Sequence, residues 1–351
     1  MKTSKMLFLL AAAAVVSLFL GYSVAQAAGV PSVAPMIAGA LFLASFIPKG
    51  SYSLAVEAPD LSALTTAFVK FGGTILRKHV NKFNLGKGVT PYRSVKVPVA
   101  MTKLSATQGP RPYTAADNTG TGAAFTNRVL TVHQSKLDFD VDPEKYRNTF
   151  LNDNSGAPFY QIILDQVATE YMSAIQMNTV GKGVYNAAGT TAADIADGYI
   201  TILKNLVTAT TMTAIVIGSI DATNAVTKVE TFAEAQPSWW KEQGFVIKCS
   251  YAVLEAYKKH YRTLNGFGFK PDEIGQYRLD GMNVILEPNS WMTGSGLLGV
   301  VFDAMAFGTD GDQIQVAASM RRNIIEVRLM MPIGFEFEDL DCISVSDALV
   351  A

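Results

Sequence analysis

Residues 128–141 read RVLTVHQSKLDFDV, and the alternation of apolar and polar side chains predicts two β-strands, Arg128–His133 and Lys136–Val141. Tyr92–Val99 (YRSVKVPV) alternates in the same way. Between these stretches, Ser105–Ala124 is rich in Thr, Gly, Pro, Ala and Asn, which is typical of an exposed loop. We therefore expect a long β-hairpin that projects from a body as an arm. Its tip should be flexible in an isolated subunit and ordered by neighbouring subunits.

Two amphipathic helices are predicted on either side of this arm. The first is Asp60–Phe83, with a break possible at Gly72–Gly73, and its apolar side chains are Leu61, Leu64, Phe68, Phe71, Ile75 and Leu76. The second and clearest is Pro158–Val180, whose stripe consists of Phe159, Ile163, Val167, Tyr171, Ala174 and Ile175. At about 1.5 Å per residue it spans roughly 33 Å, which suits a scaffold spine. We expect Ile163 and Tyr171 to be buried together on one face.

Strands and helices alternate after the second helix, which indicates a small α/β domain. The expected elements are helix Thr191–Val207 with a capping box of Thr191 and Asp194, buried strand Ala214–Ile217, strand Gly244–Cys249, helix Tyr251–Leu264 capped by Ser250, and strand Met282–Leu286. The chain then returns to strands at Val300–Ala306, Asn323–Met331 and Gly334–Val345, the last two separated at Pro332.

The N-terminus has the layout of a secretory signal peptide over residues 1–27. Lys2 and Lys5 precede the apolar run Met6–Leu20, and Ala25-Gln26-Ala27 resembles a cleavage site. A second apolar run, residues 35–48, is too short to cross a bilayer comfortably. It fits an interfacial segment, a buried segment or an extension of a membrane anchor.

Composition excludes few functions. The chain has 351 residues, 49% hydrophobic and 17% charged, and a net charge of -1. This balance lacks the basic footprint of a nucleic-acid-binding protein, although a container for DNA needs no such footprint. Cys249 and Cys342 each lie in an apolar, strand-like run, which favours two buried thiols over a disulfide. The three histidines, His79, His133 and His260, are far apart and have no metal-ligand spacing.

No catalytic pattern is present: the sequence has no G-x-S-x-G elbow, no P-loop and no G-x-G-x-x-G after a strand. The acidic residues Glu336, Glu338, Asp339 and Asp341 fit a solvated strand face better than a cation site. Asp310 and Asp312 fit a hairpin turn rather than a calcium loop, Trp239 and Trp240 fit core or subunit contact rather than a sugar platform, and Arg321 and Arg322 fit a solvated loop. We therefore expect no enzyme activity, no catalytic residue, no metal ligand and no cofactor.

Three stretches resemble a known family. Phe245–Asn265 (FVIKCSYAVLEAYKKHYRTLN) looks like a strand followed by a helix, Leu279–Ile285 (LDGMNVI) like the next Gly-x-x-Val strand, and Asn323–Arg328 (NIIEVR) like a closing strand of one lineage. From Thr90 onward, the order of elements is also similar to that lineage, the major capsid proteins of tailed bacteriophages with the Hong Kong 97-type fold.

The resemblance implies an α+β fold of the Hong Kong 97 type, with peripheral and apical domains. It assigns residues 28–89 to an N-terminal arm and helix, 90–145 to the extended β-hairpin arm, 146–186 to the spine helix of the peripheral domain, 187–288 to the apical α/β domain, and 289–351 to returning peripheral strands. The implied function is that of a major capsid subunit that self-assembles into an icosahedral shell around DNA. Implied partners are further copies in hexamers and pentamers, other virion proteins, and packaged DNA without sequence-specific contact.

The apolar leader departs from this family, because cleaved N-terminal segments in the family are typically polar and helical. Location in the virion capsid is therefore weighed against export to the periplasm, outer membrane or cell surface. In that alternative the chain is an exported or envelope-attached structural protein, such as a surface-layer or fibre subunit, with membrane contact through its N-terminal apolar segments. An exported enzyme is a third interpretation, which the missing catalytic pattern disfavours.

Overall fold

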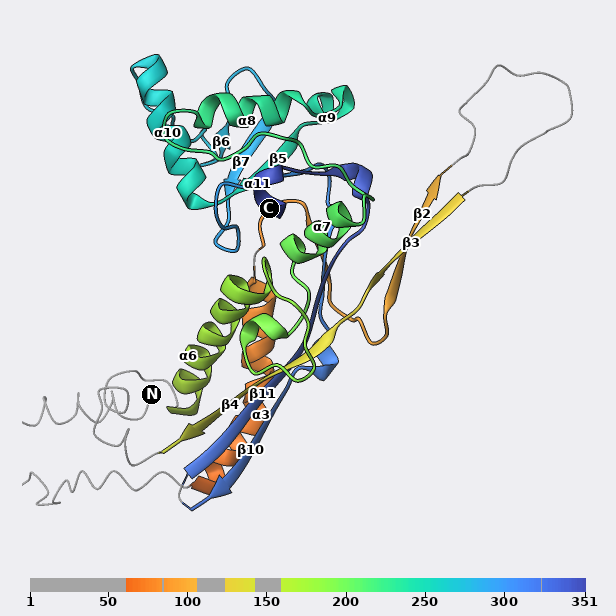
Figure 1. Ribbon diagram of the computed structural model, residues 1–351. Coiled ribbons are helices and arrows are strands. Elements are labelled where there is room, and N and C mark those ends of the chain that lie inside the picture. The colour runs from red at the N-terminus through yellow and green to blue at the C-terminus, as the bar shows by residue number, and fades with distance from the viewer. Residues whose placement is uncertain (1–60, 84, 106–123, 143–158, 323) are drawn as a thin grey trace, which may run out of the picture. The chain divides into compact units, whose positions relative to one another are not determined.

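The computed structural model describes residues 61–83, 85–105, 124–142, 159–322 and 324–351 (Figure 1). The predictions for the leader, for residues 35–48 and for the arm tip at 106–123 lie outside this part of the chain. Compact units are 1–58 and 59–351, and every described residue belongs to the second. Helices and strands are mixed, which confirms the α+β prediction. None of the helices in the described part is both long enough and apolar enough to cross a membrane.

Two long helices cover the main sheet. Helix α3 (Leu61–Lys82) is continuous, so the suggested break at Gly72–Gly73 is absent. Gly72 permits close packing here, because a β-carbon would lie 2.7 Å from Cγ2 of Val316 in the sheet. Helix α6 (Phe159–Ala174) continues into the π-helical turn η1 (Ile175–Thr179), which confirms the long helix predicted for Pro158–Val180 over its described residues.

The buried face of α6 differs from the predicted stripe by about one residue. Its buried side chains are Leu164, Ala168, Tyr171, Met172 and Ile175 of η1. Tyr171 is buried as predicted, whereas Ile163 is only partly buried against the same core. The difference arises because this helix has more than one row of apolar side chains with helical spacing. Packing against the core decides which of these rows is buried.

The main sheet has five strands, β1 (Val89–Tyr92), β4 (His133–Val141), β9 (Met305–Gly308), β10 (Gln315–Arg321) and β11 (Ile324–Phe337). Strand β11 pairs with β10, β4 and β9 along its length. It runs through Pro332, so the prediction of two strands separated at this proline is wrong. Pro332 lies beyond Met330, the last β11 residue that β10 pairs, where the missing N–H group is tolerated.

The arm hairpin is present, but its first strand is displaced. Strand β2 (Val99–Ser105) pairs antiparallel with β3 (Ala124–Leu130), and these two strands form a separate two-stranded sheet. The predicted strand Tyr92–Val99 is therefore wrong: Tyr92 ends β1, Ser94 forms an isolated bridge with Asp310, and β2 begins only at Val99. The second predicted strand, Lys136–Val141, is confirmed within β4, which pairs with β11.

The α/β section contains a second five-stranded sheet in the order β12-β8-β5-β7-β6. The strands are β5 (Phe245–Cys249), β6 (Tyr277–Arg278), β7 (Val284–Pro288), β8 (Leu298–Val300) and β12 (Ile343–Val345). The helices are α7 (Tyr199–Thr208), α8 (Ala225–Glu234), α9 (Ser238–Gln243), α10 (Tyr251–Asn265) and α11 (Asp347–Val350). Short 3-10 turns are η2 (Ala192–Asp194), η3 (Gly311–Gln313) and η4 (Leu340–Cys342).

Several predictions in this section were accurate and others were not. Ser250 caps α10 by accepting the N–H of Val253, and Gly266 ends the helix in the left-handed conformation. The capping box of Thr191 and Asp194 exists, but it starts the turn η2, and the helix begins only at Tyr199. The predicted strand Ala214–Ile217 is wrong: it holds only an isolated bridge, Ile215 to Ser346.

Two large hydrophobic clusters organise the described residues. One joins α3, α6, α7 and the main sheet, and the other joins α8, α9, α10, β5 and β7. The order of hairpin, long helix, α/β section and returning strands is the order predicted from the sequence. The domain boundaries at residues 187 and 288 stay predictions.

Candidate functional site

The β2–β3 hairpin has two unlike faces. Because side chains alternate along a strand, Val99, Met101 and Lys103 share a face with Arg128 and Leu130 of the partner strand. This face, called the body face, contains the buried side chains Met101 and Leu130, and these pack with Val95 and Ala306.

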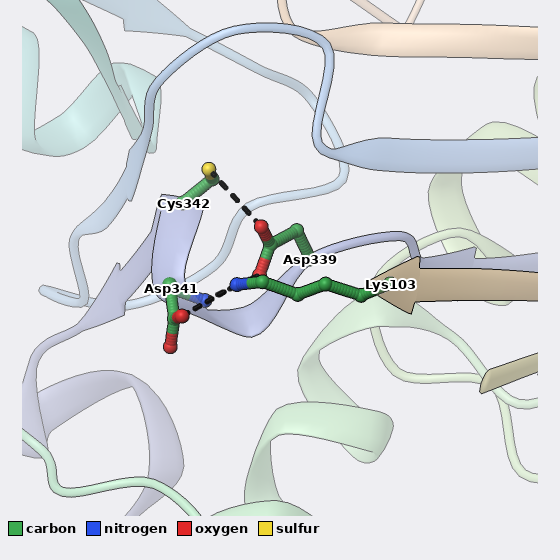
Figure 2. Close-up of polar contacts among 4 residues, drawn as sticks. All are labelled: Lys103, Asp339, Asp341 and Cys342. Carbon is green, nitrogen blue, oxygen red and sulfur yellow. Dashed lines mark hydrogen bonds and ion pairs between the residues drawn. The ribbon is translucent and has the colours of Figure 1, made fainter. Parts of the chain in front are cut away.

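The body face is fixed by ion pairs at its outer end. Lys103 Nζ lies 2.7 Å from Asp339 Oδ1 and 2.5 Å from Asp341 Oδ2. Figure 2 shows the lysine side chain reaching from β2 to both carboxylates, with Cys342 on the far side of Asp339. Partial desolvation lowers the pKa of Lys103, but hydrogen bonds to the two carboxylates outweigh it and the pKa is raised. Desolvation raises the pKa of Asp339, but the hydrogen bond from Lys103 and further interactions outweigh it. The pKa of Asp339 is therefore lowered overall.

A second ion pair lies further along the same face. Arg128 Nη2 donates to Glu336 Oε1 at 2.5 Å, and both side chains are largely buried. The hydroxyl of Tyr92 donates to Glu338 Oε1 at 3.0 Å. Burial, followed by the bond to Glu338, raises the pKa of Tyr92.

The acidic cluster is therefore not the solvated strand face expected from the sequence. Glu336, Glu338, Asp339 and Asp341 all bind side chains of β1, β2 or β3. Within the described residues no group of side chains has the composition of a metal site. The cluster anchors the hairpin to the end of β11 and to η4.

The base of the hairpin is packed through two glycines. A β-carbon at Gly308 would lie 2.9 Å from Val132 Cγ1 and 3.0 Å from Leu130 Cδ2. At Gly334 it would overlap the backbone of Thr131. The bend between β3 and β4 thus lies directly on β9 and β11.

Within the described strands β2 and β3, the other side of the hairpin, called the open face, carries no charged side chain. Its residues are Ala100, Thr102, Leu104, Phe125, Asn127 and Val129, and all are exposed. Leu104 and Phe125 are directly opposite each other and are 61% and 69% exposed. A two-stranded ribbon is only marginally stable in water by itself, so an uncovered apolar face is a poor end state.

The other residues considered from the sequence have structural positions. Trp240 is buried in the second cluster, while Trp239 is 41% exposed. Asp310 caps the turn η3. The predicted hairpin turn is wrong, because β9 and β10 both pair with β11 and not with each other. Arg321 lies 3.5 Å from Glu326, and Arg322 is exposed.

The cysteines and histidines also have structural environments. Cys249 and Cys342 are free thiols, and desolvation raises the pKa of Cys249 to about 12 and of Cys342 to about 11. Cys249 is buried as predicted, whereas Cys342 is only partly buried. The three histidines have separate partners: His79 contacts Asp165, His133 stacks on Tyr185, and His260 accepts the N–H of Val226.

Sequence reasoning missed an ion pair made by a fully buried lysine. Lys248 of β5 is fully buried, and its Nζ lies 2.7 Å from Glu287 Oε2 and 3.2 Å from the carbonyl oxygen of Leu85. Glu287 also accepts the backbone N–H of Lys87. The pair therefore holds the segment after α3 against the second sheet. Burial lowers the pKa of Lys248 despite the attraction of Glu287. A lysine within an apolar strand was the available signal.

No family model matches this sequence, and no curated protein matches it. Among solved structures, the chain is similar to one from the satellite phage P4 procapsid including size determination (Sid) protein. The identity is 12%, the TM-score is 0.47, and 78% of this chain and 97% of that chain are covered.

It is also similar to a chain of the capsid of Myoviridae phage XM1, at 11% identity and a TM-score of 0.46, with 74% and 89% covered. A chain from the capsid of an empty GTA particle has 10% identity and a TM-score of 0.45, with 76% and 88% covered. All three belong to capsids or procapsids.

Proposed function

We propose that this chain is a shell-forming structural protein, the major capsid subunit of a virion, and not an enzyme. The observation that carries the proposal is the two-faced hairpin. Its body face is held by Lys103 and Arg128, and its open face presents uncharged apolar side chains to solvent. An arm fixed on one side and uncovered on the other is suited to lie across a neighbouring subunit.

Such a shell is stabilised by the surface that each subunit buries against its neighbours, repeated over many subunits. Burial of apolar surface contributes roughly 25 cal/mol per Å2, offset by the lost freedom of each subunit. We propose hexamers and pentamers of the same chain as building units of an icosahedral shell. DNA would be enclosed without sequence-specific contact, consistent with the net charge of -1.

The domains follow from this proposal. Within residues 90–145, the hairpin strands β2 and β3 would act as the extended arm, while β1 and β4 pair within the main sheet. Residues 146–186 would act as the spine region. Residues 187–288 would form most of the apical domain. Of residues 289–351, strands β9, β10 and β11 would return to the peripheral domain, while β8 and β12 complete the second sheet.

The direct test is assembly of the purified protein. A variant lacking residues 1–27, expressed without export, is expected to fold and to form large closed particles. Size-exclusion chromatography and electron microscopy would measure this. A well-folded monomer that never assembles under varied salt and protein concentration would overturn the shell proposal.

The leader-like sequence of residues 1–27 favours a second candidate, an exported or envelope-attached structural protein. N-terminal sequencing of protein from cells separates the two candidates. A chain that begins near Ala28 and is recovered from the envelope supports the second, whereas cytoplasmic particles support the first.

A further inference from the structure

A pair of aromatic side chains, Trp239 of α9 and Phe302 between β8 and β9, is exposed on the α/β section. Their rings are stacked, with centroids 6.3 Å apart and planes inclined by 21°. Trp239 is 41% exposed and Phe302 is 61% exposed. This pair is called the aromatic platform below.

The backbone at Phe302 is in a conformation that phenylalanine rarely adopts. Its φ is 55°, in the left-handed region that glycine occupies without strain. Bulky side chains at such angles are outliers, and they cluster at functional sites. The ring of Phe302 is also largely exposed to water. Contacts within its own chain therefore offset little of the backbone strain or of the exposure of apolar surface.

The loop that carries Phe302 is held firmly on both sides. Val301 donates its N–H to the carbonyl oxygen of Cys342 at 3.1 Å. The carbonyl oxygen of Asp303 accepts the hydroxyl of Thr90 at 3.2 Å, and that of Ala304 accepts the N–H of Glu338 at 2.8 Å. The platform is thus presented by a fixed loop that borders the anchor of the arm, since Cys342 ends η4 with Asp341.

We propose that the aromatic platform is the docking site for the open face of the hairpin from a second copy of this chain. This inference rests on the proposed shell function and names the surface on which the arm would dock. The occupant is a second copy because the body face of a chain's own hairpin is bound to η4 and β11. Its open face therefore points away from its own body.

The two surfaces match in chemistry. The open face carries no charge, and Leu104 and Phe125 form a cross-strand pair suited to pack on flat rings. Cores of protein interfaces are depleted of charged residues and enriched in aromatic ones. A head-to-tail contact that closes into a ring also needs its two different surfaces on the same chain, and this chain has both.

A double-mutant cycle tests the contact. The chains compared are unmodified protein, Phe125→Ala, Trp239→Ala and the double variant, and the readout is the lowest protein concentration at which particles form. Each single variant is expected to raise this concentration about tenfold, as for a residue central to an interface. The double variant is expected to match the singles, because both remove one contact. A rise of about a hundredfold in the double variant would mean independent effects and would overturn the docking site.

Phe302→Gly is a second test, in which the stability of the monomer and its assembly are expected to respond differently. Glycine relieves the strain, so the thermal midpoint of the monomer should rise or stay unchanged, while assembly weakens. Met320→Ala, at an exposed methionine on β10 away from both surfaces, is the matched control and should assemble normally. Normal assembly of Phe302→Gly would contradict the proposal.

A disulfide trap identifies the contacting copies directly. Phe125→Cys and Trp239→Cys chains are mixed, assembled and oxidised with glutathione disulfide, which accepts the two electrons. A linked dimer of one chain of each kind is expected, and its absence from well-formed particles would count against the site. If the unmodified chain never assembles, both proposals fail. If it assembles but the cycle shows independent effects, only the docking site fails.

Discussion

Gly334 of β11 lies directly against the backbone of Thr131, so closely that a β-carbon at position 334 would overlap the carbonyl oxygen of Thr131. Thr131 belongs to the bend where the chain leaves the hairpin strand β3 and enters β4. Together with the packing of Gly308 against Leu130 and Val132, this contact sets how closely the base of the arm lies on the main sheet.

Gly334→Ala is therefore expected to destabilise the protein by about 1–3 kcal/mol, the usual range for overpacking. The obstacle is backbone, which cannot rotate away as a side chain can. Chemical denaturation would measure the free energy of unfolding. Gly311→Ala is the control, because its β-carbon would lie 3.6 Å from the carbonyl oxygen of Arg93, an ordinary contact. Equal losses in the two variants would contradict this account of the arm base.

The anchor at Lys103 should show a defined pH dependence. The pKa of Asp339 is lowered in the folded protein, so its contribution is present above about pH 4 and is lost as pH falls through the folded pKa. The pKa of Lys103 is raised, so its contribution is present below about pH 10 and is lost as pH rises through the folded pKa. The stability difference between wild type and Lys103→Met should be greatest between these limits.

The size of this difference should be about 1 kcal/mol or less, as for partly exposed ion pairs. Thermal unfolding of both proteins from about pH 3 to about pH 11 would measure it on both sides of this window. Lys96→Met is the matched control, since Lys96 and Asp312 are 2.7 Å apart but mostly exposed. A Lys96 variant that loses as much stability as the Lys103 variant would show that burial does not strengthen the anchor.

Local signals in the sequence predict the elements that depend on local contacts. Helix α10 has a serine cap at its start and a glycine at its end, and each lies next to the helix end that it defines. Its apolar stripe lies along the helix between them. Strand β5 is a mainly apolar run, interrupted by Lys248, and it is buried on both faces. The ends of α10 could be predicted because their signals are neighbours in space as well as in sequence. Strand β5 pairs with the distant β7 and β8, and it could be predicted only because its residues are mainly apolar.

Elements that depend on distant partners could not be predicted. Residues 214–217 are apolar, yet Val216 is 82% exposed, because the bridge of this segment is to Ser346, far along the chain. The acidic cluster at the end of β11 and in η4 binds Lys103 and Arg128, which lie more than 200 positions earlier in the chain. The spacing of residues in a sequence does not indicate such distant pairings. The acidic pattern therefore predicts a solvated strand face, where the structure has the anchor of the arm.

The spine helix gives a prediction in which two adjacent residues differ. Leu164 is buried in the core and Ile163 is only partly buried. Leu164→Ala is expected to cost about 2–5 kcal/mol, the range for buried leucines. Ile163→Ala should cost clearly less, because part of its side chain already contacts water. Denaturant titration of both variants would decide, and a larger loss for Ile163→Ala would restore the stripe predicted from the sequence.

The ion pair of the buried Lys248 with the partly exposed Glu287 gives a further prediction. Lys248→Met removes the cation that contacts both Glu287 and the carbonyl oxygen of Leu85. Because the side chain of Glu287 is 22% exposed, leaving its carboxylate without a partner should cost less than the about 3–5 kcal/mol typical of a fully buried pair. Adding Glu287→Gln removes the uncompensated charge, and its amide oxygen can still accept the N–H of Lys87. The double variant should therefore be more stable than Lys248→Met alone, as measured by the free energy of unfolding in denaturant. If the double variant loses the sum of the two single losses, the two side chains do not act as a pair and the segment after α3 is held by other contacts.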